Sequence, residues 1–268
     1  MQIKKKHNYN LIIGCILTGV LLLMAIVGQF WTPYGETEMN GAAKNMAPCL
    51  AHLMGTDNFG RDIFSRVMIG SGSTFIVALC TVVIGAVFGT IIGALTGYFG
   101  GWIDEIIMRV CDVILSFPSI LLALIFISLL GGGTYNIIIA LGVLFIPSFS
   151  RIVRSEMIRC KDLDFVRSAK VMGAGSFRII FVHILPNTWV SMLTAAMIGF
   201  NNAVLAEASM SYLGLGVQPP HASLGRMLSE AQTLLYNAPW CAIAPGIVII
   251  LIILGFSMIS EGMRKMNG

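Results

Sequence analysis

Long apolar runs separated by short polar segments dominate the pattern of this 268-residue chain. Six of the runs are long enough to cross the hydrocarbon core of a bilayer, which requires about 20 helical residues. Inside that core only helices and closed barrels satisfy their backbone groups, and uninterrupted apolar runs indicate helices. We therefore predict an all-α, polytopic membrane protein with six spans, placed near residues 10–31, 73–98, 104–130, 135–153, 187–207 and 239–260.

The composition agrees with this interpretation. Only 11% of the residues are charged, whereas soluble domains carry about a quarter, and the mean hydropathy is +0.85. The six cysteines form no C-x-x-C pair and show no zinc spacing, so we expect neither a disulfide framework nor a bound metal. The first span follows Lys4–Lys6 but is too long for the apolar core of a signal peptide, so we expect it to be retained.

The positions of Lys and Arg predict the orientation of the spans, because cytoplasmic loops carry an excess of positive charge. With a cytoplasmic N-terminus, four of the 17 basic residues face outward, namely Lys44, Arg61, Arg66 and Arg226. The others face inward, which predicts that both termini and the loop 154–186 are cytoplasmic. These inward residues are Lys4, Lys5, Lys6, Arg109, Arg151, Arg154, Arg159, Lys161, Arg167, Lys170, Arg178, Arg264 and Lys265.

The second predicted span carries four glycines at a four-residue spacing, which places them on one helix face. Such a face lets another helix approach closely, where van der Waals contact drives association in lipid. Two interpretations follow, packing within this chain and a seam between subunits, and the first is favoured. The four are Gly85, Gly89, Gly93 and Gly97.

A polar segment, residues 164–187, follows the fourth predicted span and reads DFVRSAKVMGAGSFRIIFVHILPN. The pattern predicts two short helices joined at Gly173, with the second helix stopped by Pro186, which cannot continue a hydrogen-bonded helix. Two such helices would form a rigid projection that a groove on a soluble partner could receive. The alternative is an amphipathic loop that rests on lipid headgroups.

This segment resembles the coupling segment of ABC importer permeases, whose pattern is Glu-Ala-Ala, three residues, Gly, nine residues and Ile-x-Leu-Pro. The last Ala, the Gly and the Leu-Pro of that pattern are present, whereas Arg replaces Glu, Ser replaces the first Ala and His replaces Ile. The histidine is ordinary in the peptide and nickel branch of these permeases. The resemblance implies that seven residues couple the chain to an ATPase: Arg167, Ser168, Ala169, Gly173, His183, Leu185 and Pro186.

Two further stretches resemble signatures of the same branch. Residues 55–66, GTDNFGRDIFSR, resemble L-G-T-D-x-x-G-R-D-x-x-S-R, and residues 207–220, EASMSYLGLGVQPP, resemble E-A-x-L-S-F-L-G-L-G-V-Q-P-P. The chain as a whole is similar to the "C" permease of dipeptide, oligopeptide and nickel ABC importers. We expect the acids and bases of the first signature to pair locally on the outer surface. Its signature positions here are Gly55, Thr56, Asp57, Gly60, Arg61 and Asp62.

The second signature begins at Glu207, at the outer end of the fifth span, and continues into a glycine-rich stretch. Irregular backbone at membrane depth persists where it lines a cavity or is buried in protein. This predicts a gate or a lining of the translocation path, in which Glu207 meets a cationic group of the substrate. In the alternative, the carboxylate satisfies loop amides. The candidate residues are Glu207, Ser211, Gly214 and Gly216.

Two smaller groups have competing interpretations. Arg109 and Asp112 lie three residues apart in the third span, where an ion pair is favoured over a proton relay, and the proline of Ser116-Phe117-Pro118 is expected to kink the helix. In the outer loop Cys49, His52 and Met54 contain soft-metal ligands. A histidine at this place is common in the family whatever the substrate, so no metal site is predicted.

The chain has no phosphate-binding G-x-x-x-x-G-K loop, no H-E-x-x-H and no G-x-S-x-G. We therefore predict a permease subunit without enzymatic activity, in the bacterial cytoplasmic membrane, importing a dipeptide, an oligopeptide or a nickel complex. Residues 1–72 would hold the first span and outer loop, and residues 73–268 the core transmembrane domain with the coupling segment 164–187. A passive channel and an intramembrane enzyme are the alternatives.

The resemblance also implies the other subunits of the transporter. These are a second homologous permease, two cytoplasmic ATPases that bind the ATP, and an extracytoplasmic substrate-binding protein. No cofactor is expected on this chain, and no nucleic acid. ATP-driven closure of the ATPases would move the docked coupling segment and tilt the spans from inward-open to outward-open.

Overall fold

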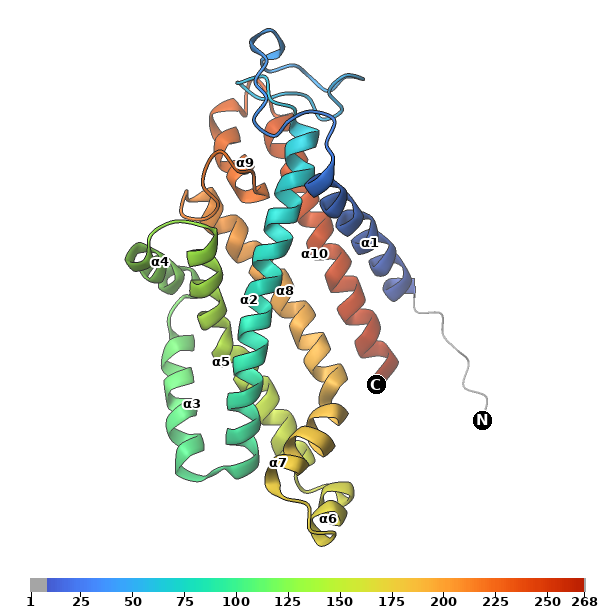
Figure 1. Cartoon of the computed structure of the whole chain (residues 1–268), viewed down its shortest axis with the longest axis vertical. Helices are drawn as coiled ribbons and strands as arrows, with labels where there is room; N and C mark the ends of the chain where they lie inside the picture. The colour runs from blue at the N-terminus through green and yellow to red at the C-terminus, as the bar shows by residue number, and fades with distance from the viewer. Residues whose placement is uncertain (1–8, 268) are drawn as a thin grey trace. The chain divides into compact units, whose positions relative to one another are not determined.

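A computed structural model describes residues 9–267, in which helices and short helical turns account for nearly all regular structure (Figure 1). The all-α prediction is confirmed. Lys4–Lys6, which contribute to the predicted orientation, lie outside the described residues. The α-helices are α1 Tyr9–Phe30, α2 Ile63–Phe99, α3 Gly101–Ser116, α4 Ser119–Leu130, α5 Thr134–Cys160, α6 Asp164–Val171, α7 Ser176–Arg178, α8 Trp189–Tyr212, α9 Leu224–Ala231 and α10 Trp240–Asn267.

Five helical stretches in the described chain are long and apolar enough to cross a membrane, and a sixth is obtained if α3 and α4 form one broken span. They agree with the six predicted spans by length and composition. Two starts differ most: the stretch that leads into α8 begins at Ser176, eleven residues before the predicted start at residue 187, and α2 begins ten residues before the predicted start at residue 73. Its 37 residues extend for about 55 Å at 1.5 Å per residue, well beyond the ~30 Å hydrocarbon core.

The third predicted span, 104–130, is not one helix. It is divided into α3 and α4, which are bent by 94° at the break. Phe117 adopts extended backbone angles (φ −86°, ψ 145°), because a residue before proline is driven out of the α region. The expected kink at Pro118 is therefore a complete interruption. Neither α3, with 16 residues, nor α4, with 12 residues, reaches the ~20 residues needed to span alone.

The chain forms two compact units. Unit 1 comprises residues 1–79, 127–138 and 200–268, and unit 2 comprises residues 80–126 and 139–199. The boundary that the sequence suggested, between residues 72 and 73, falls inside α2. In unit 1, α1 packs on α10: Gly14 lies so near Gly255 and Ile259 that an added Cβ would approach them within 3.0 Å.

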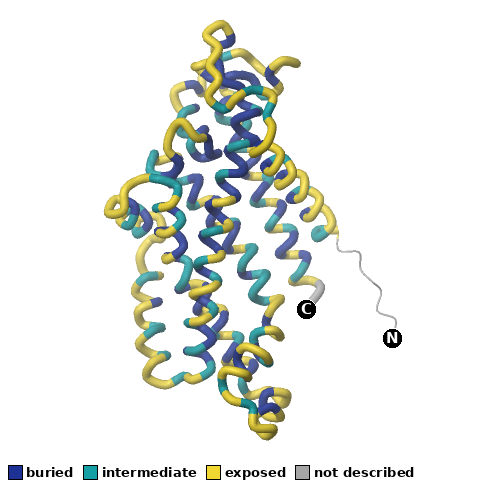
Figure 2. The backbone as a smooth tube through the Cα atoms, in the orientation of Figure 1, coloured by how far each residue is buried: buried dark blue, intermediate teal, exposed yellow. Residues whose placement is uncertain are grey.

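The two sides of α1 differ in burial. Gly14, Thr18, Leu21, Ala25 and Gly28 are buried, whereas the opposite side exposes large apolar residues (Figure 2). Exposed aliphatic side chains on a long helix suit contact with lipid tails rather than water. The exposed set is Ile12, Ile13, Ile16, Val20, Leu23 and Ile26.

In unit 2 the glycine stripe of α2 packs against α5. A Cβ added at any of the four glycines would lie under 3.0 Å from an atom of α5, such as Phe145 Cβ at 2.7 Å for Gly85. The favoured interpretation, packing within the chain, is therefore confirmed. Small residues let two helix backbones approach closely, and this contact stabilises helix pairs in lipid.

The predicted ion pair between Arg109 and Asp112 is wrong. Asp112 instead accepts from Arg151 of α5, and Arg109 lies 3.9 Å from Glu105. An acid one turn before a base is the favoured order on a helix, whereas Arg109 precedes Asp112. A second pair between the same two helices joins Arg154 Nε to Asp104 Oδ1 at 2.6 Å.

Candidate functional site

The first half of the 164–187 segment has the predicted form, a short helix, α6, that ends at Val171 and is followed by a turn at Gly173. In α6, Val166 and Ala169 are buried among apolar residues of unit 2. Asp164 lies in the first turn of α6 and Lys170 in the last, where each charge complements the helix dipole. Gly173 has φ +82°, a left-handed conformation that glycine adopts without strain.

The second half differs from the prediction, because Pro186 does not stop the helix. From Ser176 the chain continues into α8 through a π-helical turn, Ile179–Ile184, and a 3₁₀ turn, Leu185–Thr188. The Leu185 N–H bonds to the carbonyl of Ile180, five residues back. The wide turn and the short 3₁₀ turn that begins at Leu185-Pro186 accommodate a residue that has no N–H.

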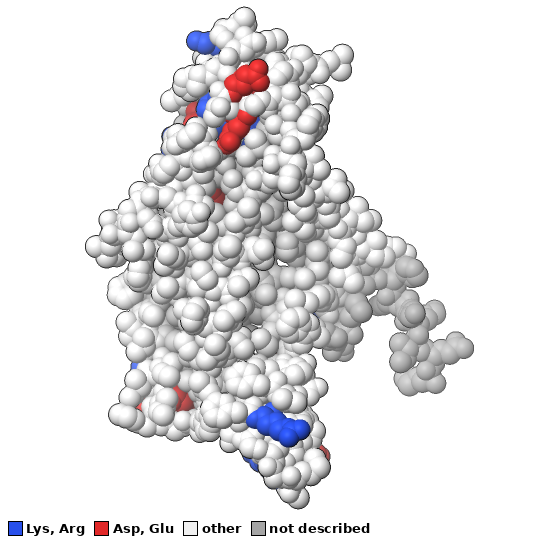
Figure 3. Space-filling model, viewed as in Figure 1, with Lys and Arg blue, Asp and Glu red and all other residues white. Residues whose placement is uncertain are grey.

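The surface of this segment combines apolar and basic residues. Val171 and Met172 are 89% and 79% exposed, and Phe177 is 66% exposed. Arg167 and Arg178 are also exposed, and Lys and Arg atoms are visible over this end of unit 2 in Figure 3. Lys170 lies over the ring of Tyr98 at 5.6 Å. One side of α6 is therefore fixed to its own chain and the other side is uncovered.

Unit 1 contains a different kind of polar site, the charge cluster, which we define as Asp57, Arg61, Arg66 and Glu230. Asp57 Oδ2 lies 2.6 Å from Arg61 Nε and 3.0 Å from an Arg66 guanidinium nitrogen. Glu230 Oε2 lies 2.9 and 3.0 Å from the same two arginines. Asp57, Arg61 and Arg66 are all buried. The buried Asp57 and the partly exposed Glu230 thus compensate the two buried arginines, and Glu230 also pairs with Arg226 at 3.2 Å.

Tight turns place the acids and bases of this cluster. Gly55 and Gly60 both have φ +75°, and the Asp57 carboxylate accepts the backbone N–H groups of Phe59 and Arg61 at 2.8 and 3.0 Å. Asp62 likewise accepts from the Ser65 N–H and hydroxyl at 2.7 Å. An aspartate in this position caps the orphan donors at the start of α2.

The expected local pairing of this signature is correct, but its expected place on the surface is wrong. The residues are buried because α9 covers them and contributes Glu230, which sequence reasoning missed. A usable signal existed: Arg226 and Glu230 lie four residues apart on a short amphipathic helix. Burial alone would raise the pKa of the Glu230 carboxyl, but the charges of Arg66 and Arg61 outweigh burial and lower its pKa.

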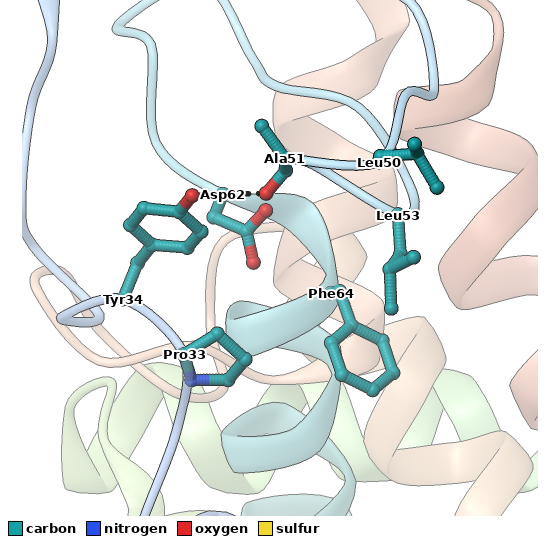
Figure 4. A pocket seen from close by; sticks show the side chains of 7 residues that line it. All are labelled: Pro33, Tyr34, Leu50, Ala51, Leu53, Asp62 and Phe64. Atoms are coloured by element: carbon teal, nitrogen blue, oxygen red, sulfur yellow. Dashed lines mark hydrogen bonds between the residues drawn. The ribbon is translucent and has the colours of Figure 1, made fainter.

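Of the residues considered for a soft metal, His52 has other partners. His52 Nδ1 lies 2.9 Å from Asp62 Oδ1, and its ring centroid lies 4.7 Å from that of Tyr34, with the rings tilted by 33°. Beside them is a hollow of about 380 Å³ in which the Tyr34 hydroxyl donates to the Ala51 carbonyl (Figure 4). The hollow is lined by Pro33, Tyr34, Leu50, Ala51, Leu53, Asp62 and Phe64.

Glu207 of α8 is fully buried in unit 1. Its carboxylate accepts from the hydroxyls of Thr74 at 2.9 Å and Ser211 at 2.6 Å, and from Ser223, which precedes α9. The alternative in which loop amides hold this carboxylate is therefore incorrect in detail. The Val217 N–H reaches it indirectly, by donating to the Ser211 hydroxyl at 3.2 Å.

The glycines after Glu207 shape the loop around Ser211. Gly214 has φ +82°, and a Cβ at Gly216 would overlap the Ser211 hydroxyl. Ser211, Gly214 and Gly216 thus lie together with Glu207 in unit 1, as candidates for one site. The side chains assigned to coupling lie in unit 2.

Long apolar helices that pack closely through glycines define a polytopic membrane protein. The sequence profile of one family, described as binding-protein-dependent transport system inner membrane component, matches residues 89–266. The chain belongs to this family and is a transmembrane permease subunit.

Relatives of known name cover nearly the whole chain. It is 40% identical to the dipeptide transport system permease protein DppC of Alkalihalophilus pseudofirmus, over 97% of this chain and 85% of that protein. It is 37% identical to the glutathione transport system permease protein GsiD of Pectobacterium atrosepticum, over 93% of this chain and 84% of the relative. The DppC protein of Haemophilus influenzae is 36% identical, over 97% and 90% of the two chains.

A solved structure has the same fold. A chain of the MetNI methionine ABC transporter, in an inward-facing conformation, aligns with a TM-score of 0.60 and 20% identity. The alignment covers 74% of this chain and 96% of that chain. This likeness establishes the permease fold and carries no information on the solute.

Proposed function

We propose that this chain is a permease subunit of an ATP-driven importer for short peptides, with residues 164–187 as the segment through which ATPases drive it. The relatives named above are permeases of dipeptide and glutathione transport systems. Both solutes are short peptides, so the class of solute is narrower than the sequence alone indicated. Nickel complexes are not favoured by these names.

The observation that carries the coupling role is the two-sided structure of α6. Val166 and Ala169 bind it to unit 2, whereas Val171 and Met172 are left almost fully exposed. Burial of apolar surface is a main source of binding free energy between proteins. A helix that is packed on its own unit and carries exposed apolar residues on its free side is suited to transmit movement from a docked ATPase.

The remaining assembly follows from this role. The transporter comprises this chain, a homologous second permease, two cytoplasmic ATPases that hold the ATP, and an extracytoplasmic binding protein. This chain binds no cofactor. In this proposal both termini and the 164–187 segment are on the cytoplasmic side of a bacterial cytoplasmic membrane, which the distribution of Lys and Arg supports.

We assign the gate to Glu207, Ser211, Gly214 and Gly216 of unit 1. Glu207 joins α2, α8 and the start of α9 through three hydroxyl groups. A buried carboxylate held by short hydrogen bonds fixes the elements that supply the donors. Opening of the gate would release these hydroxyls and expose the carboxylate to a cationic group of the peptide.

The test is ATPase activity of the reconstituted complex with its binding protein and candidate solutes, for wild type, Gly173→Pro and Gly175→Pro. Proline imposes φ near −65°, which is incompatible with the φ of +82° at Gly173 but matches the φ of −69° at Gly175. We expect loaded binding protein to stimulate the wild type and Gly175→Pro, and we expect Gly173→Pro to lose the stimulation.

The solute that gives stimulation identifies the substrate class. Stimulation by di- or tripeptides supports the peptide assignment, and stimulation by a nickel complex alone contradicts it. If no ATPase copurifies with the wild type, the chain acts without one and the coupling role is wrong. If Gly173→Pro couples normally, the turn at Gly173 is not part of the coupling structure.

A further inference from the structure

The free face of α6 carries Arg167, a charge that is in none of the ion pairs among residues 9–267. Asp164, Arg167, Ser168 and Val171 lie at positions i, i+3, i+4 and i+7 and therefore share one side of the helix. All four are exposed.

Two other charged residues of α6, Asp164 and Lys170, have stabilising interactions that Arg167 lacks. Asp164 lies in the first turn of α6, where the helix dipole stabilises a negative charge. Lys170 lies in the last turn and over the ring of Tyr98 at 5.6 Å. Arg167 occupies the middle of the eight-residue helix, where the dipole has little effect. One turn further on, Val171 is 89% exposed.

From this arrangement we infer that the ATPase groove that receives α6 presents a carboxylate to Arg167, beside an apolar pocket for Val171 and Met172. The inference rests on the proposed function, because it specifies the chemistry of the docking partner. A guanidinium binds a carboxylate through two parallel hydrogen bonds, which gives orientation as well as attraction. Such a pair would fix the rotation of α6 in the groove.

A membrane surface is the other candidate for a basic and apolar face, but the same face of α6 argues against it. Asp164 lies one turn from Arg167, and a second exposed acid, Asp162, precedes it. Anionic lipid headgroups would repel both acids, whereas a protein groove can place a positive group or water opposite them. The mixed charge therefore favours a protein with a single, placed carboxylate.

The test uses the complete transporter, purified through the ATPase, with Arg167→Lys, Arg167→Gln and Arg167→Glu in the permease. Arg264→Glu is the matched control, because Arg264 is also exposed but lies in α10, outside residues 164–187. We expect Arg167→Glu to lower retention of the permease by about tenfold or more, since a like-charge contact replaces an attraction. Arg167→Gln should have a smaller effect and Arg167→Lys the smallest, and Arg264→Glu should remain near wild type.

Charge reversal on the ATPase then identifies the partner. Each acidic residue of its docking groove is changed to Arg in turn, in complexes with wild-type permease and with Arg167→Glu. We expect one such change to weaken the wild-type complex and to restore the Arg167→Glu complex. Thermal unfolding of the permease variants verifies that the exposed substitutions leave the fold intact.

Several results would overturn the inference. Wild-type retention of Arg167→Glu would show that Arg167 faces no carboxylate. Equal losses for Arg167→Glu and Arg264→Glu, without rescue by any reversal, would show a general attraction of basic residues, as at a lipid surface. Both results are separable from failure of the proposed function, in which the wild-type permease itself would not retain an ATPase.

Discussion

The charge cluster of unit 1 and the free face of α6 in unit 2 differ in whether their charged side chains are buried and paired. In the charge cluster, Arg66 is 2% exposed and contacts both Asp57 and Glu230 at 3.0 Å. On α6, Arg167 is exposed and none of the ion pairs in the described chain includes it. The buried charges of the charge cluster are paired within one chain, whereas Arg167 is in no ion pair of the described chain.

This difference separates structural sites from docking sites. A buried charge must be paired, because removal from water costs several kcal/mol for each ion unless a partner compensates. An exposed charge stays hydrated, so it has no such desolvation cost, and a surface ion pair contributes little to stability. The charge cluster should therefore respond to mutation through folding, and the free face of α6 should respond through binding.

Asp57→Ala should have the largest effect on stability, since it leaves two buried arginines with Glu230 as their remaining acid. Asp57 also holds the turn through the Phe59 and Arg61 N–H groups. Loss of one member of a buried ion pair typically costs about 3–5 kcal/mol. The measurement is the free energy of unfolding of the detergent-solubilised permease. Asp162→Ala, at an exposed acid before α6, is the control and should change it by less than ~0.5 kcal/mol.

Equal effects of these two substitutions would remove the distinction between the regions. The same would hold if Asp57→Ala were neutral while the binding protein no longer stimulated the transporter. In that case the charge cluster would be a docking site despite its burial.

Glu230→Gln should be the next most destabilising change. The amide keeps the shape of the side chain but loses the charge-assisted bonds to Arg61 and Arg66, which we expect to cost about 2 kcal/mol at pH 7. Because the pKa of folded Glu230 is lowered from its ordinary value of 4.5, the ionised carboxylate contributes full stability above that value. The contribution declines as the pH falls through the lower pKa of the folded state.

The pH dependence of the unfolding free energy tests whether the charge of Glu230 causes this effect. The difference in unfolding free energy between wild type and Glu230→Gln should be constant above about pH 5 and should shrink at more acidic pH. Glu230→Ala should lose the same pH-dependent part and a further part from packing. A difference that does not vary with pH would show that the charge of Glu230 is not what stabilises the arginines.

Gly173→Ala should have a smaller effect, confined to the turn after α6. Nothing lies within 4 Å of a Cβ added there, so the cost arises from the backbone, whose φ is +82°. A left-handed conformation costs a non-glycine residue about 1–2 kcal/mol. Gly175→Ala is the matched control, because φ there is −69° and the added Cβ also meets nothing. Gly175→Ala should be neutral or slightly stabilising, because alanine lowers the conformational entropy of the unfolded chain. Denaturant unfolding of the two variants should give opposite or clearly unequal changes.

Sequence reasoning succeeded where a single local rule decides the structure. Apolar runs become helices because lipid offers no other partner for backbone groups, and Gly85 to Gly97 pack on α5 because the four-residue spacing admits a second backbone. The amphipathic run predicts the helix α6, and Gly173 predicts the turn that follows it. These features need no knowledge of distant residues.

The features that failed depend on long-range contacts or on competing local rules. Hydropathy continues through Phe117, so it cannot reveal that α3 and α4 bend by 94°. Pro186 indicates a helix stop, but a π-helical turn before it lets the chain continue. Glu230 lies 169 positions from Arg61, so nothing in the 55–66 signature indicates that α9 supplies its second acid.

Val171→Ser should have the smallest effect on stability and a clear effect on coupling. Val171 is 89% exposed, so the free energy of unfolding should change by less than about 0.5 kcal/mol. Val166, in the same helix, is fully buried, and Val166→Ser should cost about 2 kcal/mol by placing a hydroxyl in an apolar core. If Val171 fills an apolar pocket of the ATPase, Val171→Ser should reduce ATPase retention severalfold, as at interface hot spots. Reduced retention without loss of stability would show that the uncovered side of α6 is completed by another protein. A loss of stability equal to that of Val166→Ser would show that both sides of α6 belong to the fold of this chain alone.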